Sequence, residues 1–254
     1  MINKAFLAVV VAMLFTGHAM AEEKTAVIAA DPWCPHTCGA TEARPGYMVE
    51  VARQALTSRG WTVTYKNAPW ARVMRDVKAG NADGAVGALR GEAGGMVLHA
   101  EPLGRQSNVF VVRAADPWSL QGLDSLRGRK VASVKDYSYS EAIDSWLAGG
   151  HTEVQALGGE NALDRNLKKL LSGRVDVVVE DEAVLLHTLR SGKLGDKLRI
   201  AGRLPGGDLY IAFTPVGGRG GRLAESLDQG IRELRASGEL GRILGGYGLK
   251  DWKE

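Results

Sequence analysis

The chain has 254 residues, 45% of them hydrophobic and 24% charged, a composition typical of a globular protein with one large or two medium domains. Its formal net charge of +3 is too small to indicate a nucleic-acid-binding protein, and no run rich in lysine and arginine occurs. The 33 glycines indicate many tight turns between short elements.

The first 21 residues have the three parts of a secretory signal peptide. Lys4 supplies the basic start, residues 5–15 are apolar, and Ala19 and Ala21 are the small residues before a cleavage site expected after Ala21. A membrane anchor is the weaker alternative, because the apolar run is well short of the ~20 residues that span a bilayer. No cysteine follows the cleavage site, so we expect a periplasmic protein that is not a lipoprotein.

The two cysteines, Cys34 and Cys38, lie in the stretch CPHTC. In an oxidising periplasm a disulfide between them is the favoured interpretation. A metal site built from Cys34, His36 and Cys38 is less favoured, because the local sequence supplies no fourth ligand. The spacing excludes a CxxC redox pair. We therefore expect a stiffened loop, with no metal and no cofactor.

The first part of the mature chain alternates strands and helices. Buried strands are expected at 25–30, 61–66 and 83–88, and helices with one apolar face at 48–56 and 70–77. This β-α-β-α-β order predicts a parallel sheet with right-handed crossovers.

A second alternating run follows a strand at 108–113 and a turn-rich linker. Its strands and helices, and the elements that end the chain, are expected in the following order: strand 130–134, helix 140–147, strand 153–157, helix 163–171, strand 175–179, a helix through Leu189, strands 198–202 and 209–213, and a helical region at 221–244.

These elements predict an α/β protein with two lobes. The first lobe would comprise residues 22–112 and 208–254 and the second residues 113–207, joined by two crossings near Val112 and Gly207. Ligands of open parallel sheets bind beyond the carboxyl ends of the strands, so a binding cleft is expected between the lobes.

The mature chain resembles the periplasmic solute-binding proteins of polar amino-acid ABC transporters, the family 3 type with the type II Venus-flytrap fold. Within that family it looks closest to a branch with a WCPxxC start and a YGLKDW-like end. The segments that carry the resemblance are PGYMVEVARQAL, PWARVMRDVKAGNADGAVGAL, SLRGRKVASVKDYSYS, NLKKLLSGRVDVVVEDEA and IRELRASGELGRILGGYGL.

The resemblance implies a set of ligand-binding residues at the strand ends. In amino-acid binders the acid that closes the GRxDxxxxD strand receives the ligand ammonium group, and the matching residue is Asp181. Trp70 matches an aromatic residue that stacks on the ligand. The full set expected is Asp31, Trp33, Trp70, Leu89, Arg90, Tyr137, Ser138 and Asp181.

Two features depart from the family pattern. The TxxR arginine that clamps an α-carboxylate is replaced by RGEAGGM, and the GTT turn is replaced by DYS. Either Arg90 substitutes as the carboxylate clamp, or the ligand has no α-carboxylate. Each main candidate also has a structural alternative: Asp181 as a helix N-cap, Trp70 as a core residue and Arg90 as a surface residue.

No catalytic motif occurs, so we expect a monomeric binding protein that delivers a small polar solute, first of all an amino acid, to an ABC transporter permease. A sensor module for a membrane receptor is the main alternative. A cyclohexadienyl-dehydratase-like enzyme, with Glu180 or Asp181 as general acid, is a weaker one.

Overall fold

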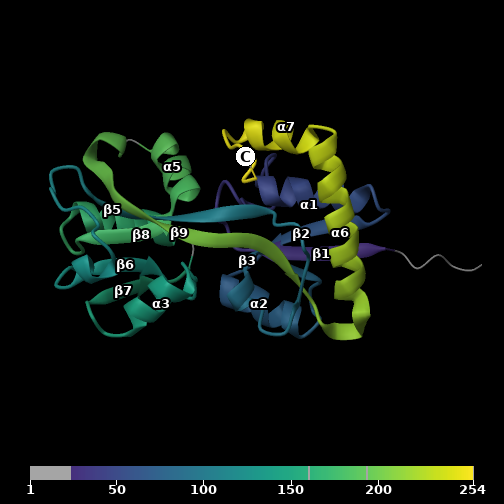
Figure 1. Ribbon diagram of the computed structural model, residues 1–254, viewed down its shortest axis with the longest axis horizontal. Coiled ribbons are helices and arrows are strands. Elements are labelled where there is room, and N and C mark those ends of the chain that lie inside the picture. Colours follow the sequence, from purple (N-terminus) through teal and green to yellow (C-terminus); the bar gives the residue numbers. More distant parts are fainter. Residues whose placement is uncertain (1–23, 160, 193, 254) are drawn as a thin grey trace, which may run out of the picture.

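A nine-stranded sheet runs through both halves of the computed structural model, which describes residues 24–159, 161–192 and 194–253 (Figure 1). The strand order is β2-β1-β3-β9-β5-β8-β6-β7, and the short strand β4 (Val97–Leu98) pairs with β9. The expected signal peptide lies outside the described residues. Within the described part of the chain, no helix is both long enough and apolar enough to cross a membrane.

The first lobe contains the three parallel strands expected from the sequence, and the last two helices of the chain return to it (Figure 1). Its elements are β1 (Thr25–Ala30), α1 (Tyr47–Thr57), β2 (Thr62–Asn67), α2 (Trp70–Lys78), β3 (Gly84–Leu89), α6 (Arg219–Ala236) and α7 (Glu239–Gly246). The expected helical region at 221–244 is divided, because Gly238 adopts a φ of 77° between α6 and α7.

The second lobe repeats the alternating pattern around a parallel three-stranded unit. Its elements are β6 (Val131–Val134), α3 (Glu141–Ala148), β7 (Val154–Leu157), α4 (Ala162–Leu171), β8 (Val177–Asp181) and α5 (Glu182–Ser191). The apolar run of β8 is fully buried, as a strand covered on both faces requires.

Two long antiparallel strands, β5 (Gly104–Arg113) and β9 (Leu198–Phe213), connect the lobes (Figure 1). The two late strands expected at 198–202 and 209–213 are therefore one continuous strand, because residues 203–205 and 208 also pair with β5. The crossing strands approach closely at Gly206, where an added Cβ would lie 2.6 Å from the carbonyl oxygen of Gln106.

The packing of β5 favours a first crossing earlier in the chain than the expected position near Val112. Val109 and Val111 pack in one core of the second lobe, and Phe110 and Val112 pack in the other. We therefore propose that the lobes exchange at about residues 104–107 and 205–207, instead of near Val112.

Candidate ligand-binding site

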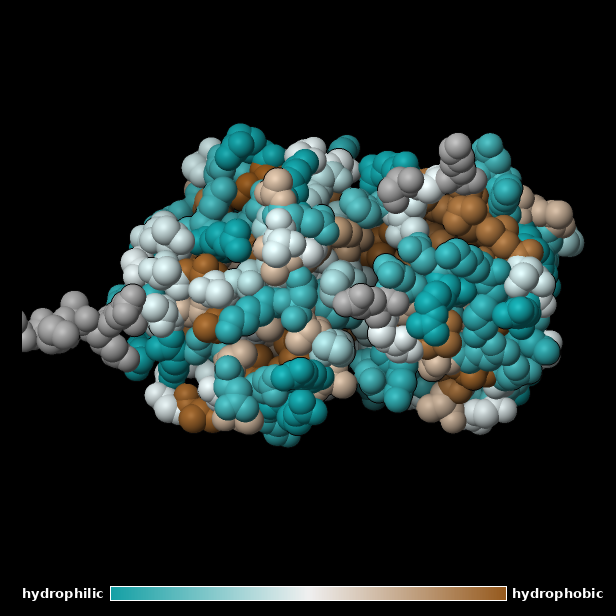
Figure 2. Space-filling view, turned by 180° about the vertical axis from the view of Figure 1, so that it is seen from behind, coloured by the Kyte–Doolittle hydropathy of each residue, from teal (hydrophilic) through white to brown (hydrophobic). Residues whose placement is uncertain are grey.

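A cavity of about 30 Å³ lies where the carboxyl ends of the first-lobe strands meet the second lobe, in the region where the space-filling outline narrows (Figure 2). Both lobes and one crossing strand contribute to its wall. The lining residues are Asp31, Trp33, Trp70, Val86, Gly87, Leu89, Glu92, Gln106, Tyr137 and Ser138.

The structure brings six of the eight expected ligand-binding residues to this cavity. Their positions follow from strand ends: β1 ends just before Asp31, β3 ends at Leu89, and α2 begins at Trp70. Tyr137 and Ser138 follow β6 of the second lobe. The strand-end argument therefore explains why residues distant in sequence converge here.

Asp31 and Tyr137 connect the two lobes across the cavity. The Tyr137 hydroxyl donates a short hydrogen bond to Oδ2 of Asp31. Burial raises the pKa of Asp31 to about 6, and the bond from Tyr137 opposes part of that rise. Burial also raises the pKa of Tyr137, so the phenol keeps its proton and remains the donor.

Trp70 is held by an acid that sequence reasoning missed. Its indole Nε1 donates to Oε1 of Glu92 at 3.1 Å, while Oε2 of Glu92 accepts from the backbone N–H of Leu89 at 2.9 Å. Trp70 also packs with Val73 in the core, so the buried apolar face of α2 extends to the cavity wall at Trp70. Glu92 lies in the segment RGEAGGM, three residues past the end of β3, so its closeness to a strand end is the signal in the sequence.

Gln106 is the second lining residue that the sequence did not reveal. Its side chain is 4% exposed, and Nε2 donates to the carbonyl oxygen of Ser138 at 3.2 Å. Its Oε1 has no hydrogen-bond partner among the described residues. It lies on the crossing strand β5, which was expected to begin only at Asn108.

Asp181 does not line the cavity, contrary to the expected role as the ammonium acceptor. It is 1% exposed and caps α5, accepting from the N–H groups of Ala183 and Val184 at 2.9 and 3.2 Å. It also accepts from the Ser107 N–H at 3.0 Å and lies 2.8 Å from Nε2 of His36. Both oxygens are thus occupied inside the protein, in agreement with the N-cap alternative.

Arg90 also lies outside the cavity wall. Its exposed side chain stacks over Tyr210, with the guanidinium carbon 4.8 Å from the ring centroid, and donates to the Tyr210 hydroxyl at 2.9 Å. Arg90 is therefore held by a side chain of β9, and none of the lining residues is an arginine or a lysine.

Another buried acid, Glu180, contacts the lining residue Trp33 but does not itself line the cavity. Its Oε1 accepts from Nε1 of Trp33 at 3.1 Å and from the N–H of Asp181 at 2.8 Å. Burial, followed by the repulsion of Asp181 and Asp31, raises the pKa of Glu180 to about 7. Trp33 stacks on His36 with ring centroids 4.2 Å apart, so this stack links the first lobe to both acids at the end of β8.

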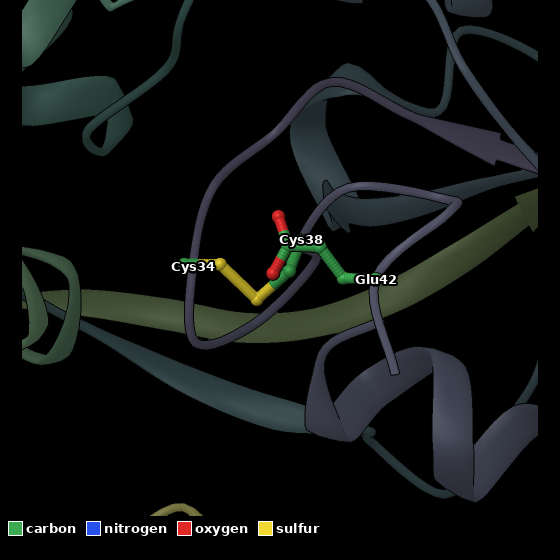
Figure 3. Close-up of side chains that lie close together, drawn as sticks. All are labelled: Cys34, Cys38 and Glu42. Carbon is green, nitrogen blue, oxygen red and sulfur yellow. A yellow bond between two sulfur atoms is a disulfide. The ribbon is translucent and has the colours of Figure 1, made fainter. Parts of the chain in front are cut away.

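The loop that carries Trp33 and His36 is closed by a disulfide between Cys34 and Cys38, with an S–S distance of 2.02 Å (Figure 3). Glu42 lies beside the two sulfurs and accepts from the N–H of Gly39 at 3.1 Å. Because both sulfurs are bonded to each other and both His36 nitrogens lie within 2.9 Å of other side chains, this loop does not supply the alternative metal site.

A scan of the sequence against protein-family models found no match, and a search of curated proteins found none either. Solved structures do match. The amino-acid ABC transporter substrate-binding protein AbpA from Streptococcus pneumoniae, bound to L-arginine, has a TM-score of 0.70 and 21% identity, covering 88% of this chain and 94% of that one. A histidine kinase sensor domain similar to periplasmic binding proteins has a TM-score of 0.73 and 22% identity, covering 90% and 99%.

An ancestral amino-acid-binding protein, AncCDT-1, described as a precursor of cyclohexadienyl dehydratase, has a TM-score of 0.69 and 13% identity, covering 88% of this chain and 95% of that one. Together these likenesses establish the fold class. The chain has the two-lobed, type II periplasmic-binding-protein fold, which confirms the fold expected from the sequence.

Proposed function

We propose that this protein captures a small polar solute between its two lobes and releases it to the permease of an ABC transporter. The observation that carries the proposal is that residues of both lobes line one cavity. A ligand that contacts both walls stabilises only the conformation in which the walls face each other, so binding would favour the closed state.

The two crossing strands are the proposed hinge. The regular pairing of β5 with β9 is interrupted where the strands leave the first lobe, because the register shifts between Arg105 and Ser107. A hinge closure needs only a few element-terminal residues to change their backbone angles. Closure about this hinge would form and break the cross-lobe contacts of Trp33, His36 and Tyr137.

The transport assignment rests on the fold, on the name of the arginine-bound relative and on the signal-peptide pattern. We place the mature protein in the periplasm as a monomer, with an amino acid or a related small molecule as ligand. The histidine kinase sensor domain of the same fold supports a second candidate, a sensor module that passes its closed state to a membrane receptor.

We propose binding without turnover. Glu180 has the raised pKa of a general acid, but its carboxyl is bonded to Trp33 and lies outside the cavity lining. The fold also occurs in a precursor of cyclohexadienyl dehydratase. An assay for turnover of prephenate and arogenate therefore accompanies the binding test, and we expect no product.

The test is a thermal-shift screen with amino acids, amines and organic acids, followed by calorimetry on each solute that raises the melting temperature. We expect Trp70→Ala in the first lobe and Tyr137→Ala in the second each to weaken binding at least tenfold. Lys135→Ala, an exposed change beside Tyr137, is the control and should bind normally. Unchanged affinity in both cavity variants would refute the proposed site.

A further inference from the structure

We infer that the ligand is a small organic amine, bound as a cation, without a carboxylate group. This inference rests on the proposed function, since it assigns a ligand class to the same cavity. It follows from the charges, the unused acceptors and the occupied donors of the cavity wall.

The fixed charges around the cavity are all negative. Asp31 and Glu92 line it, and neither lysine, arginine nor histidine does. Burial raises the pKa of Glu92, and the negative charges of Asp144 and Asp31 add to the rise, so these acids repel one another. A cationic ligand would relieve this repulsion, whereas a ligand carboxylate would add to it.

Four side-chain donors of the wall are already used within the protein. The two indole N–H groups donate to Glu92 and Glu180, the Tyr137 hydroxyl donates to Asp31, and the Ser138 hydroxyl donates to Asp144. A ligand carboxylate, which only accepts, would find no free side-chain donor among these groups.

One buried side-chain atom of the wall that lacks a partner among the described residues is an acceptor, Oε1 of Gln106. The carbonyl of Ser138 can only accept, so the amide nitrogen of Gln106 must face it and Oε1 is the atom left over. This buried oxygen has no partner among the described residues, and an unsatisfied buried acceptor is costly. An ammonium group would supply the missing donor.

The apolar part of the wall also suits a cation. Trp33, Trp70 and Tyr137 surround the space, and aromatic rings attract organic ammonium groups through their π faces. Trp33 and Tyr137 meet edge to face, with ring centroids 6.1 Å apart.

Matched pairs test the inference directly, because each amine is its amino acid without the carboxylate. The pairs are ethylamine and alanine, cadaverine and lysine, agmatine and arginine, and phenethylamine and phenylalanine. We expect calorimetry to show at least one amine binding at least tenfold more tightly than its amino acid. If an amino acid or an organic acid is the tighter ligand, this inference is wrong while the proposed function stands. If no solute of either kind binds, both are wrong.

Variants locate the effect within the cavity. For the tightest amine, we expect Asp31→Asn to weaken binding at least tenfold and Gln106→Leu to weaken it about fivefold. Asp196→Asn, an equal charge change at an exposed position of the second lobe, is the matched control and should bind like the parent protein. Equal affinity of the Asp31→Asn and Asp196→Asn proteins, both folded by circular dichroism, would overturn the inference.

Discussion

At the scale of residues, the buried acids make the ligand-free protein sensitive to pH. Glu180 is 1% exposed and has its pKa raised to about 7, whereas an unfolded glutamate titrates near 4.5. Between these values the folded state binds more protons than the unfolded state, so this group makes stability fall as pH rises. Asp31, with a pKa of about 6, acts in the same direction.

Glu180→Gln should therefore flatten the pH dependence of stability. The amide keeps an oxygen for the Trp33 indole but does not ionise, so we expect its melting temperature relative to the parent protein to rise as pH increases from 5 to 8. Scanning calorimetry measures this difference. Glu225→Gln, at an exposed site with no hydrogen bond to a buried group, should show a constant difference over the same range. A constant difference for Glu180→Gln as well would contradict the account.

The sequence located the cavity residues that follow strand ends, because strand ends can be recognised from apolar patterning and turns. The structure places Asp181 and Arg90 outside the cavity lining, against His36 and Tyr210, which are more than a hundred positions away along the chain. Such partners are chosen by tertiary packing, which single-sequence patterns do not record. Gln106 was missed for the same reason, since its role depends on Ser138 across the lobe boundary.

At the scale of elements, Asp181 is the N-cap of α5 and also contacts buried His36. Asp181→Ala would remove both interactions and the bond from the Ser107 N–H, and would leave His36 without one partner. We expect a loss of about 2–3 kcal/mol in the free energy of unfolding, measured by urea denaturation, which is more than a cap alone provides. Ser140→Ala, which removes the simpler cap of α3, should cost about 1 kcal/mol. Equal losses would show that the His36 contact adds nothing.

The contact between α1 and α6 depends on a glycine. A Cβ at Gly230 would lie 2.5 Å from the carbonyl oxygen of Ala55, which is backbone and cannot rotate away. Gly230→Ala should destabilise the protein by about 1–3 kcal/mol. Gly221→Ala, in the same helix with open space around it, should stabilise it by about 0.5–1 kcal/mol through helix propensity. Opposite signs in urea denaturation are the expected result, and equal signs would refute this packing.

Helices with a clear apolar period were predicted well, whereas the ends of the late strands were not. The apolar faces of α1 and α2 lie where the pattern placed them. Residues 203–208 separate the two strands expected at 198–202 and 209–213, yet they belong to β9, where Pro205 pairs with Ser107 and Asp208 pairs with Arg105 of β5. Local composition predicts a break there, and tertiary pairing overrides it.

At the scale of the whole molecule, two lobes share one sheet and face each other across a cavity lined by two acids and by an amide oxygen that has no partner among the described residues. The alternation of strands and helices was enough to predict two lobes. The crossing was expected near Val112, whereas the boundary that we propose lies in the polar first part of β5, residues 104–107, which continues without a break into the apolar second part.

The most direct test of the account is a crystal structure of the protein with the tightest solute from the screen. We expect one solute molecule between the lobes, with its ammonium group about 2.7–3.2 Å from Asp31 and from Oε1 of Gln106 and its carbon atoms against Trp70. A solute held elsewhere on the protein, or contacting only one lobe, would contradict the central claim.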